Sequence, residues 1–356
     1  MEKNTIRQIP SKLIVNTPGC FIGKTSRQIV VRKDKKKVLE YPSLHLKDII
    51  ISGRGISMSS DVIEYCAAND IPMFFISSTG KTTAMFTQPY ATGDLGLIQL
   101  QTLQNSAVSI ELAKQFIYGK ISNQIEVLTY LKNKNRKNAV LKRFITPMKT
   151  TLLEMKQKKM SFTQQRMFSI EARSAKSYWA GIKELFHHRF DFTRRNKQHA
   201  KDLINSMLNY GYAILQGRVR LSLMRAGLNT EISYLHTIQP GRASLVFDLM
   251  EEFRAPVIDY TVFNLLYDEP SLSLTDEGLL SNQTRSILIQ SVLKRLDYLV
   301  RYCGRHISLD EVIECQANAI VQHINHQKPY QPYLESSQKR TGLFFMKKKS
   351  YLCRKH

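Results

Sequence analysis

The stretch 208–223, LNYGYAILQGRVRLSL, decides the architecture of most of the chain. Its apolar residues Leu208, Tyr212, Leu215, Val219 and Leu223 recur every three or four positions, which is the spacing of one face of an amphipathic helix. From about Leu97 onward the same period dominates, and glycine and proline are sparse. We therefore expect a large helical domain in the second part of the chain.

The chain before about Thr87 has a different pattern. Short runs rich in Ile, Val and Phe alternate with turn-forming residues, as in strands that are joined by loops. These runs are Lys12–Val15, Gln28–Arg32, Lys47–Ile51 and Pro72–Ser77, and one short helix fits Ser60–Asn69. Gly53 and Gly55 follow an apolar strand but lack the third glycine and the βαβ unit of a dinucleotide site, so they predict a turn.

Length and the change of period together predict two domains. At 356 residues the chain exceeds a comfortable single core. The expected fold class is α+β and multidomain, with a β-sandwich-like domain over residues 1–87 and an all-α domain over residues 97–328. Residues 88–96 are the expected linker, and residues 329–356 form an expected basic tail.

The net charge points to a polyanionic partner. Fifty-two Lys and Arg residues against 29 Asp and Glu residues give a net charge of +23. Such a surplus must lie on the surface, where it attracts nucleic acid through phosphate contacts that release counterions. A ribosome-like or membrane-surface protein that is basic without being catalytic is the alternative.

Several protein classes do not fit this sequence. No apolar run approaches the roughly 20 residues that cross a bilayer, and the polar start, Met1–Pro10, lacks the apolar core of a secretory signal. We therefore expect a cytoplasmic protein. Five scattered cysteines with no Cys-x-x-Cys pair suggest neither a disulfide framework nor a zinc cluster.

Three dense clusters of basic residues lie in the helical part. They are Lys132–Arg143, Lys156–Lys159, and the group Arg189, Arg194, Arg195, Lys197 and Lys201, which is interleaved with Phe190, Phe192 and His199. Arg and Lys beside aromatic side chains suit a phosphate backbone with partly unstacked bases. Each cluster could instead be a solvated helix face, but three in one domain favour binding.

Glu171 is the first acidic residue in an unexpected position. If 168–182 is a helix, Phe168, Ala175, Tyr178 and Ile182 lie within about 60° of Glu171, so the carboxylate falls in the apolar stripe. Burial of a carboxylate is costly unless the group is paired, hydrogen-bonded or bound to a cation. A salt bridge to an arginine of another helix is the alternative to a functional role.

The segment 245–254, LVFDLMEEFR, holds the second group of acids. On a helix, Asp248, Glu251 and Glu252 share the face opposite the apolar residues, and stacked like charges repel by a few tenths of a kcal/mol per pair. Such a face requires a counterion or free solvation. Arg or Lys could supply the counterion, and so could a metal ion.

His236 lies just upstream of this segment and completes a donor set. A lone histidine is more often a satisfied structural residue than a ligand. One imidazole with two or three carboxylates, however, provides the hard, mostly oxygen ligation that Mg²⁺ or Mn²⁺ accepts. In a protein that binds a polyanion, such a site points to phosphodiester chemistry, in which the metal polarises the phosphate and activates the attacking oxygen.

Several of these segments resemble the sequence motifs of a known protein family, and they occur in the same order along the chain. They are Glu171–Trp179 (EARSAKSYW), Arg195–Tyr212, Ala226–Arg254 and Gln316–Tyr330, with 55–57 (GIS) and 71–75 (IPMFF) in the β-rich part. Nearly end to end, the chain resembles the CRISPR-associated integrases, the "Cas-one" proteins. Ala172 stands where family members often have glycine, and the tail beyond Tyr333 matches nothing in the family pattern.

The resemblance implies an activity and a site. Family members bind a divalent metal, Mg²⁺ or Mn²⁺, through one Glu, one His and an acid, and these roles fall on Glu171, His236 and Glu251, with Asp248 as a nearby or alternative ligand. They are endonucleases and integrases that join the 3′-hydroxyl ends of a short DNA duplex to the CRISPR repeat by transesterification. The metal would bring the scissile phosphate and the attacking hydroxyl together.

The resemblance also implies partners. Family members form homodimers through the β domain, here residues 1–87, and two dimers assemble around a small Cas-two dimer. Basic residues in the matching segments are the candidates for DNA binding. They are Arg194, Arg195, Lys197, Arg218, Arg242 and Arg254.

Two rival functions remain open. A casposase-like transposon integrase would use the same triad on transposon ends, but such proteins usually add a carboxy-terminal helix-turn-helix, for which the last thirty-odd residues are too short and irregular. A non-catalytic basic nucleic-acid-binding protein would have its acidic residues salt-bridged instead.

Overall fold

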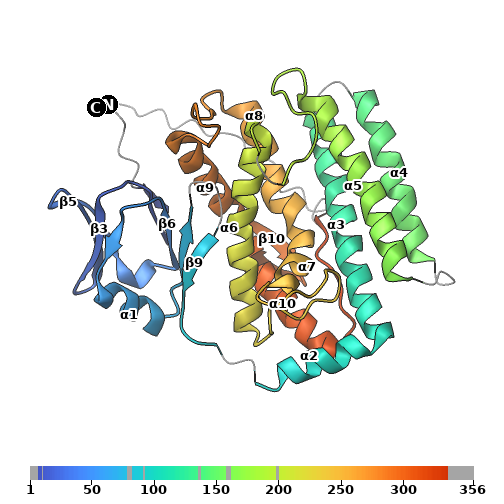
Figure 1. Cartoon of the computed structure of the whole chain (residues 1–356), viewed down its shortest axis with the longest axis horizontal. Helices are drawn as coiled ribbons and strands as arrows, with labels where there is room; N and C mark the ends of the chain where they lie inside the picture. Colours follow the sequence, from blue (N-terminus) through green and yellow to red (C-terminus); the bar gives the residue numbers. More distant parts are fainter. Residues whose placement is uncertain are drawn as a thin grey trace.

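The structure of the protein is a computed structural model, which describes residues 7–9, 11–77, 82–90, 93–134, 138–157, 162–197 and 200–335. A strand-rich first part lies beside a larger helical part, as Figure 1 shows. The expected fold class is thereby confirmed: strands come first, and helices make up most of the remaining described chain.

The first sheet has five strands in the order β1-β2-β6-β8-β9. Their bounds are Arg7–Ile9 (β1), Lys12–Val15 (β2), Asp48–Ser52 (β6), Met73–Ile76 (β8) and Thr82–Phe86 (β9). The three central strands are parallel and in register, with Ile14 opposite Ile50 and Ile50 opposite Phe74. The two edge strands are antiparallel to their neighbours.

The second sheet has four strands in the order β5-β4-β3-β7. Their bounds are Cys20–Thr25 (β3), Gln28–Lys33 (β4), Lys36–Pro42 (β5) and Ser57–Met58 (β7), and helix α1 (Ser60–Ala68) follows. Asp34 and Lys35 both have positive φ angles, of 50° and 62°, in the two-residue turn between β4 and β5. This is the turn geometry that matches the twist of a hairpin.

The central strands of the first sheet, β2, β6 and β8, are buried on both faces. Because successive side chains of a strand point to opposite sides, Leu13 and Val15 of β2 join the core between the two sheets, while Ile14 joins the core of the helical part. Ile50 and Phe74 on the neighbouring strands also face the helices. This double burial explains why these strands read as continuous apolar runs rather than as alternating ones.

The helical part is built around α7 (Ser244–Phe253), against which α3, α6 and α10 pack. The other helices surround these four. Besides α7, the helices of this part are Leu95–Gln104 (α2), Ser106–Lys134 (α3), Asn138–Lys156 (α4), Gln164–Phe186 (α5), Leu203–Arg225 (α6), Tyr260–Asp268 (α8), Asn282–Leu296 (α9) and Leu309–Ile324 (α10). A π-helical turn at Arg254–Asp259 joins α7 to α8. This wider turn contains Pro256, which has no backbone N–H group to donate to an α-helical hydrogen bond.

Two features of the helical part differ from what the sequence suggested. A hairpin of β10 (Leu299–Tyr302) and β11 (Arg305–Ser308) interrupts the helices, with Cys303 at positive φ in its turn. In addition, α7 is buried on all sides: Asp248, Glu251 and Glu252 are as inaccessible as its apolar residues. Of the two alternatives for this acidic face, free solvation is wrong, because side chains from other segments cover the face, whereas Glu251 does have basic counterions.

The segment 329–335 is part of the predicted basic tail, but its residues Tyr330, Tyr333 and Glu335 are buried in the helical core. Tyr330 and Tyr333 are buried, and the Tyr333 ring stacks on Phe253 with 5.5 Å between centroids. The Glu335 carboxylate accepts a hydrogen bond from Arg295 at 2.8 Å. The segment is buried through these aromatic side chains, which do not recur at the spacing of a helix or a strand, so the sequence pattern did not predict the burial. Residues 336–356 lie outside the described part of the chain.

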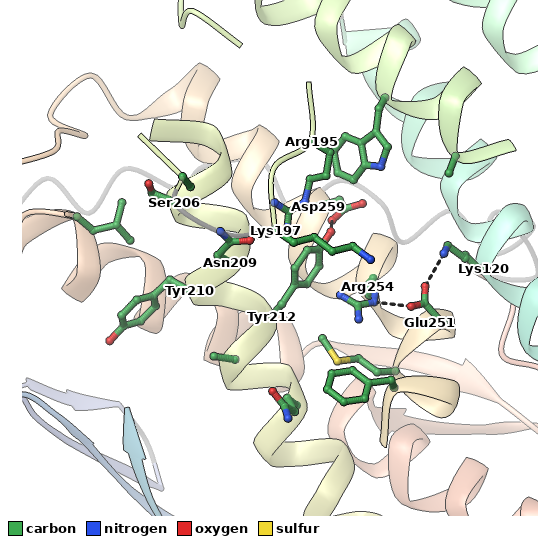
Figure 2. Close-up of a pocket in the computed structure, with 18 of the residues that line it drawn as sticks. Lys120, Arg195, Lys197, Ser206, Asn209, Tyr210, Tyr212, Glu251, Arg254 and Asp259 are labelled. Atoms are coloured by element: carbon green, nitrogen blue, oxygen red, sulfur yellow. Dashed lines mark hydrogen bonds and ion pairs between the residues drawn. The ribbon is translucent and has the colours of Figure 1, made fainter. Parts of the chain in front are cut away.

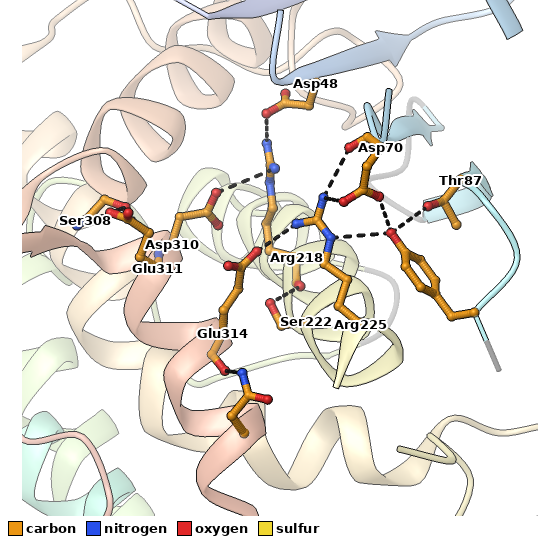
Figure 3. A network of polar contacts seen from close by, with 12 residues as sticks. Asp48, Asp70, Thr87, Arg218, Ser222, Arg225, Ser308, Asp310, Glu311 and Glu314 are labelled. Carbon is orange, nitrogen blue, oxygen red and sulfur yellow. Dashed lines mark hydrogen bonds and ion pairs between the residues drawn. The ribbon is translucent and has the colours of Figure 1, made fainter. Parts of the chain in front are cut away.

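Two arginines of α6 connect the strand-rich part to α10 (Figure 3). Arg218 lies 2.6 Å from Asp48 of β6 and 3.6 Å from Asp310 of α10. Two helical turns further along, Arg225 pairs with Asp70 at 2.8 Å and with Glu314 at 2.7 Å. The expectation that Arg218 binds DNA is wrong, since its side chain is buried and fully engaged by these carboxylates.

Neither a membrane span nor a disulfide is found among the described residues. No helix there is both long enough and apolar enough to cross a bilayer. Cys20, Cys66, Cys303 and Cys315 are free thiols, and Cys353 lies outside the described residues.

A glycine allows the first sheet to approach α6 closely. A Cβ atom added at Gly217 would lie 2.9 Å from Cδ1 of Phe74, closer than packed carbon atoms approach. We expect Gly217→Ala to lower the free energy of unfolding by roughly 1 kcal/mol, because overpacking costs about 1–3 kcal/mol and the gain in helix propensity recovers only about 1 kcal/mol. Urea denaturation measures the change.

The matched control for this prediction is Gly96→Ala on α2. A Cβ at Gly96 would meet no atom within 4 Å, so this substitution should leave stability unchanged or slightly raised. Equal effects of the two substitutions would contradict the close-approach argument.

Candidate active site

A cleft of about 800 Å³ opens between the helices of the helical part. Its lining comes from α3, α5, α6, α7, the segments before α6 and before α7, the π-helical turn and residues 277–280, which meet there although they are far apart in the sequence (Figure 2). The lining is rich in charged side chains. It includes Lys120, Arg195, Lys197, Lys201, His236, Arg242, Glu251 and Arg254.

Asp248 is the most completely satisfied carboxylate of α7. It accepts hydrogen bonds from Ser233 Oγ and from the backbone N–H groups of Tyr234, Leu235 and His236, at 2.8–3.1 Å. It is fully buried and does not line the cleft. Its oxygens are occupied by the turn that they organise, so the structure does not support Asp248 as a metal ligand.

The same carboxylate orients His236. The Nδ1 atom of His236 lies 2.8 Å from Oδ1 of Asp248. Since a carboxylate accepts, Nδ1 carries the proton, so that Nε2 is the nitrogen whose lone pair can serve as a ligand. A histidine whose second nitrogen is fixed by a carboxylate is the usual arrangement of metal-binding imidazoles.

The carboxylates of Glu251 and Glu171 both form ion pairs with the same ammonium group, that of Lys120. The ammonium of Lys120, on α3, is 2.8 Å from Oε2 of Glu251 and also donates to Oε1 of Glu171 on α5. Arg254, one turn beyond Glu251, donates from Nε to Oε1 at 2.9 Å. Figure 2 shows Glu251 between Lys120 and Arg254.

The ionisation of this cluster follows from these contacts. Burial opposes ionisation, but Arg254 and Lys120 outweigh it and lower the pKa of Glu251 to about 2. Burial would likewise lower the pKa of Lys120, yet the Glu251 and Glu171 carboxylates raise it above its ordinary value. Both carboxylate and ammonium are therefore charged at neutral pH.

Glu252 has a separate, structural environment. It is buried, and its carboxylate accepts hydrogen bonds from Tyr330 Oη, Tyr333 N and Gln316 Nε2 at 2.6–2.9 Å. Burial raises the pKa of Glu252 to about 8 in spite of these donors. Glu252 thus joins α7 to the segment 329–335 and takes no part in the cleft.

The three residues expected to form the triad are therefore only partly brought together. Glu171 and Glu251 share the Lys120 ammonium, and His236 lines the same cleft as Glu251 and helps to lower its pKa. Among the described residues, no three His, Cys, Asp or Glu side chains are placed closely enough to hold one metal ion. The ammonium lies where a cation shared by the two carboxylates would lie.

The basic residues expected to bind DNA fall into three groups. Arg195, Lys197, Arg242 and Arg254 line the cleft, whereas Arg194 is exposed outside it and Arg218 is buried at the first sheet. Arg195 is held by Asn205 Oδ1 at 2.9 Å and Asn209 Oδ1 at 2.6 Å. Its guanidinium lies over the rings of Trp179 and Tyr212. This fixed orientation suits a phosphate contact.

Sequence reasoning missed Lys120 and the floor of the cleft. Lys120 lies in a long helix among other lysines, and nothing in its local pattern marks it. Asp259, the last residue of the π-helical turn, accepts hydrogen bonds from the hydroxyls of Tyr178, at 2.7 Å, and Tyr212. Burial raises the pKa of Asp259 to about 6, although both hydroxyls lower it.

Known proteins resemble this chain over most of its length. A family model described as "CRISPR associated protein Cas1" matches residues 13–294. A protein named CRISPR-associated endonuclease Cas1 1 from Archaeoglobus fulgidus is 28% identical over 347 residues, covering 91% of this chain and 99% of that protein. A protein of the same name from Francisella tularensis subsp. novicida is 29% identical over 325 residues, covering 90% and 98%.

Solved structures share the fold. A casposase bound to integration product superimposes with a TM-score of 0.78 at 20% identity, over 91% of this chain and 93% of that chain. A Cas1 protein from Thermotoga maritima gives a TM-score of 0.72 at 19% identity, over 90% and 99%. Together with the family model, which spans both the strand-rich and the helical parts, these relatives show that the chain belongs to the Cas1 family of CRISPR-associated proteins.

Proposed function

We propose that this protein is a metal-dependent DNA integrase and endonuclease that inserts short DNA duplexes into a CRISPR array as new spacers. In the reaction, a 3′-hydroxyl attacks a phosphodiester of the repeat, one P–O bond forms, another breaks, and the leaving 3′-oxygen takes up the proton. The observation that carries the proposal is that Glu171 and Glu251, on separate helices, share one cation at a cleft lined by His236 and basic residues. The names of the curated relatives, CRISPR-associated endonucleases, support a nuclease or integrase role.

The residues present fit a divalent metal by their chemistry. Two carboxylates that already lie within reach of one cation, together with a tautomer-fixed imidazole, form the donor set that Mg²⁺ or Mn²⁺ accepts. Glu171, His236 and Glu251 would hold the ion, and Asp248 would keep the His236 ring in place. When bound, the ion would act as a Lewis acid toward the phosphate and would stabilise the negative charge that develops on its oxygens during the transfer.

The basic residues of the cleft would hold the DNA. Arg195 is pre-oriented by Asn205 and Asn209, so it can meet a phosphate without losing much side-chain entropy. Lys197 and Arg242 are exposed on the same lining and would add phosphate contacts. Arg254 is tied to Glu251 at 2.9 Å and would position that carboxylate as well as attract the backbone.

The proposed partners are double-stranded DNA with 3′-hydroxyl ends, CRISPR repeat DNA, a small Cas-two protein and a second copy of this chain. A complex named Cas6-RT-Cas1–Cas2 contains a similar fold, with a TM-score of 0.71 over 94% of this chain and 37% of that one. Residues 1–87, which hold both sheets, are the proposed dimerisation domain, joined by residues 88–96 to the catalytic domain.

A transposon integrase is the second candidate function, and the fold shared with a casposase favours it. The two functions differ in the DNA that they accept. Joining of short duplexes to a CRISPR repeat in preference to transposon ends would distinguish the first from the second. A non-catalytic basic protein would join neither.

Removal of a proposed ligand should abolish strand joining. We expect Glu171→Ala and His236→Ala each to reduce the joining of a labelled duplex to repeat DNA to background, because either change removes a donor from the proposed metal site. The measurement is a gel assay with Mn²⁺, together with circular dichroism to check the fold.

The matched control is Glu184→Ala on the same helix. Glu184 pairs with Arg143 at 3.0 Å and does not line the cleft, so its removal should leave joining within about twofold of the unchanged protein. Undiminished joining by Glu171→Ala would refute the metal assignment.

Phosphate contacts should appear in the salt dependence of DNA binding. We expect Lys197→Ala and Arg242→Ala each to weaken DNA binding without altering sequence preference. Each should also reduce the slope of log K against log salt by about 1, because a protein that makes one phosphate contact fewer releases fewer counterions when it binds. Lys36→Ala, a change of an exposed lysine on β5 far from the cleft lining, serves as the control and should leave the slope unchanged. Slopes that change equally in all three variants would place the DNA elsewhere.

A further inference from the structure

Lys120 has a position that the proposed reaction does not explain. It is part of α3, which packs against both α5 and α7, and its ammonium lies between the two acids that those helices contribute. The exposed fractions of the side chains are 12% for Lys120, 22% for Glu171 and 6% for Glu251. The contact is therefore shielded from the solvent that weakens surface ion pairs.

The direct ion pairs around Lys120 balance in charge only if it is present. Glu171 and Glu251 contribute two negative charges, whereas Arg254 and Lys120 contribute two positive ones. Arg254 contacts Oε1 of Glu251 and leaves Oε2 to Lys120. In the described part of the chain, Lys120 is the cation that forms ion pairs with both carboxylates. Its loss would leave Glu171 without this partner and Glu251 with Arg254 alone, at low exposure.

We propose that Lys120 is a resident counterion: it holds Glu171 and Glu251 together in the metal-free protein and competes with the divalent cation for them. This inference rests on the metal dependence proposed above. An ammonium and a metal ion cannot both lie between the same two oxygens, so metal binding must displace Lys120. Lys120 is thus a positioning residue, which keeps the two carboxylates together until the metal arrives.

The cleft gives the displaced ammonium a place to go. Lys120 is itself part of the lining, and its four-carbon stem can swing the charge into a space of about 800 Å³. Lys197 and Arg195 line the same space, where DNA phosphate is expected. A displaced Lys120 would then face the phosphate and lose little electrostatic stabilisation on leaving the carboxylates.

Two substitutions at Lys120 should act in opposite directions. Lys120→Met keeps the length of the side chain but removes the charge, so the carboxylates lose their internal competitor. We expect Mn²⁺ to bind at least tenfold more tightly, measured by isothermal titration calorimetry without DNA, and the metal-free protein to melt at a lower temperature. Lys120→Arg places a planar, permanently charged guanidinium group between the two carboxylates, where it can donate several hydrogen bonds. It should compete with the metal more strongly than the ammonium does, so Mn²⁺ should bind more weakly than to the unchanged protein.

The control is Lys114→Met on the same helix. Lys114 pairs with Glu111 at 3.3 Å, away from the cleft lining, and its replacement should leave Mn²⁺ affinity unchanged. If Lys120→Met does not fold, the weaker binding expected of Lys120→Arg still tests the proposal. Equal Mn²⁺ affinity in all the proteins would overturn the competition while leaving the metal site intact. Failure of every variant to bind Mn²⁺ would overturn the metal dependence itself, and the role of Lys120 with it.

Discussion

The structure depends on the burial of three carboxylates on one short helix. Asp248, Glu251 and Glu252 of α7 are almost inaccessible, and an uncompensated buried charge would cost more than a domain of this kind gains from any single contact. Each acid therefore needs its own compensation. Asp248 is satisfied by a backbone turn, Glu251 by two cations, and Glu252 by hydroxyl, amide and backbone donors with a raised pKa. Much of the arrangement of the helical part follows from supplying these partners.

The partners come from elements far apart in the sequence. The turn before α7 supplies donors for Asp248 and thereby fixes the His236 ring, whereas α3 supplies Lys120 on one side of α7. Another residue of α3, Asn123, bonds to the backbone oxygens of Glu252 and Tyr333, which fastens the carboxy-terminal segment under the helix. The residues that orient the site and the residues that stabilise the core are thus largely the same set. This sharing explains how a cleft with so many charges keeps a defined shape.

The sequence predicted part of this arrangement. Periodicity identified four of the strands and the long helix α6, and the unexpected positions of Glu171 and Glu251 marked both as functional candidates. Short strands such as β7, and the hairpin of β10 and β11, escaped because they are defined by pairing rather than by local pattern. Arg218 was misassigned because charge alone does not distinguish a phosphate ligand from a buried ion pair. Lys120 could not be found, since its importance arises only where three helices meet.

One helix, α6, serves both parts of the molecule. Along one side it carries Tyr212 and Asn209 into the cleft, and along another it receives Phe74 at Gly217 and the carboxylate of Asp48 at Arg218. A protein truncated to the helices alone would expose this second side of α6 to solvent. The corresponding strand fragment would expose an apolar face that is prone to aggregation. Protein engineers who wish to attach a label or a fusion partner should therefore leave this boundary whole and use the solvent-facing hairpin tip at Asp34–Lys35 instead.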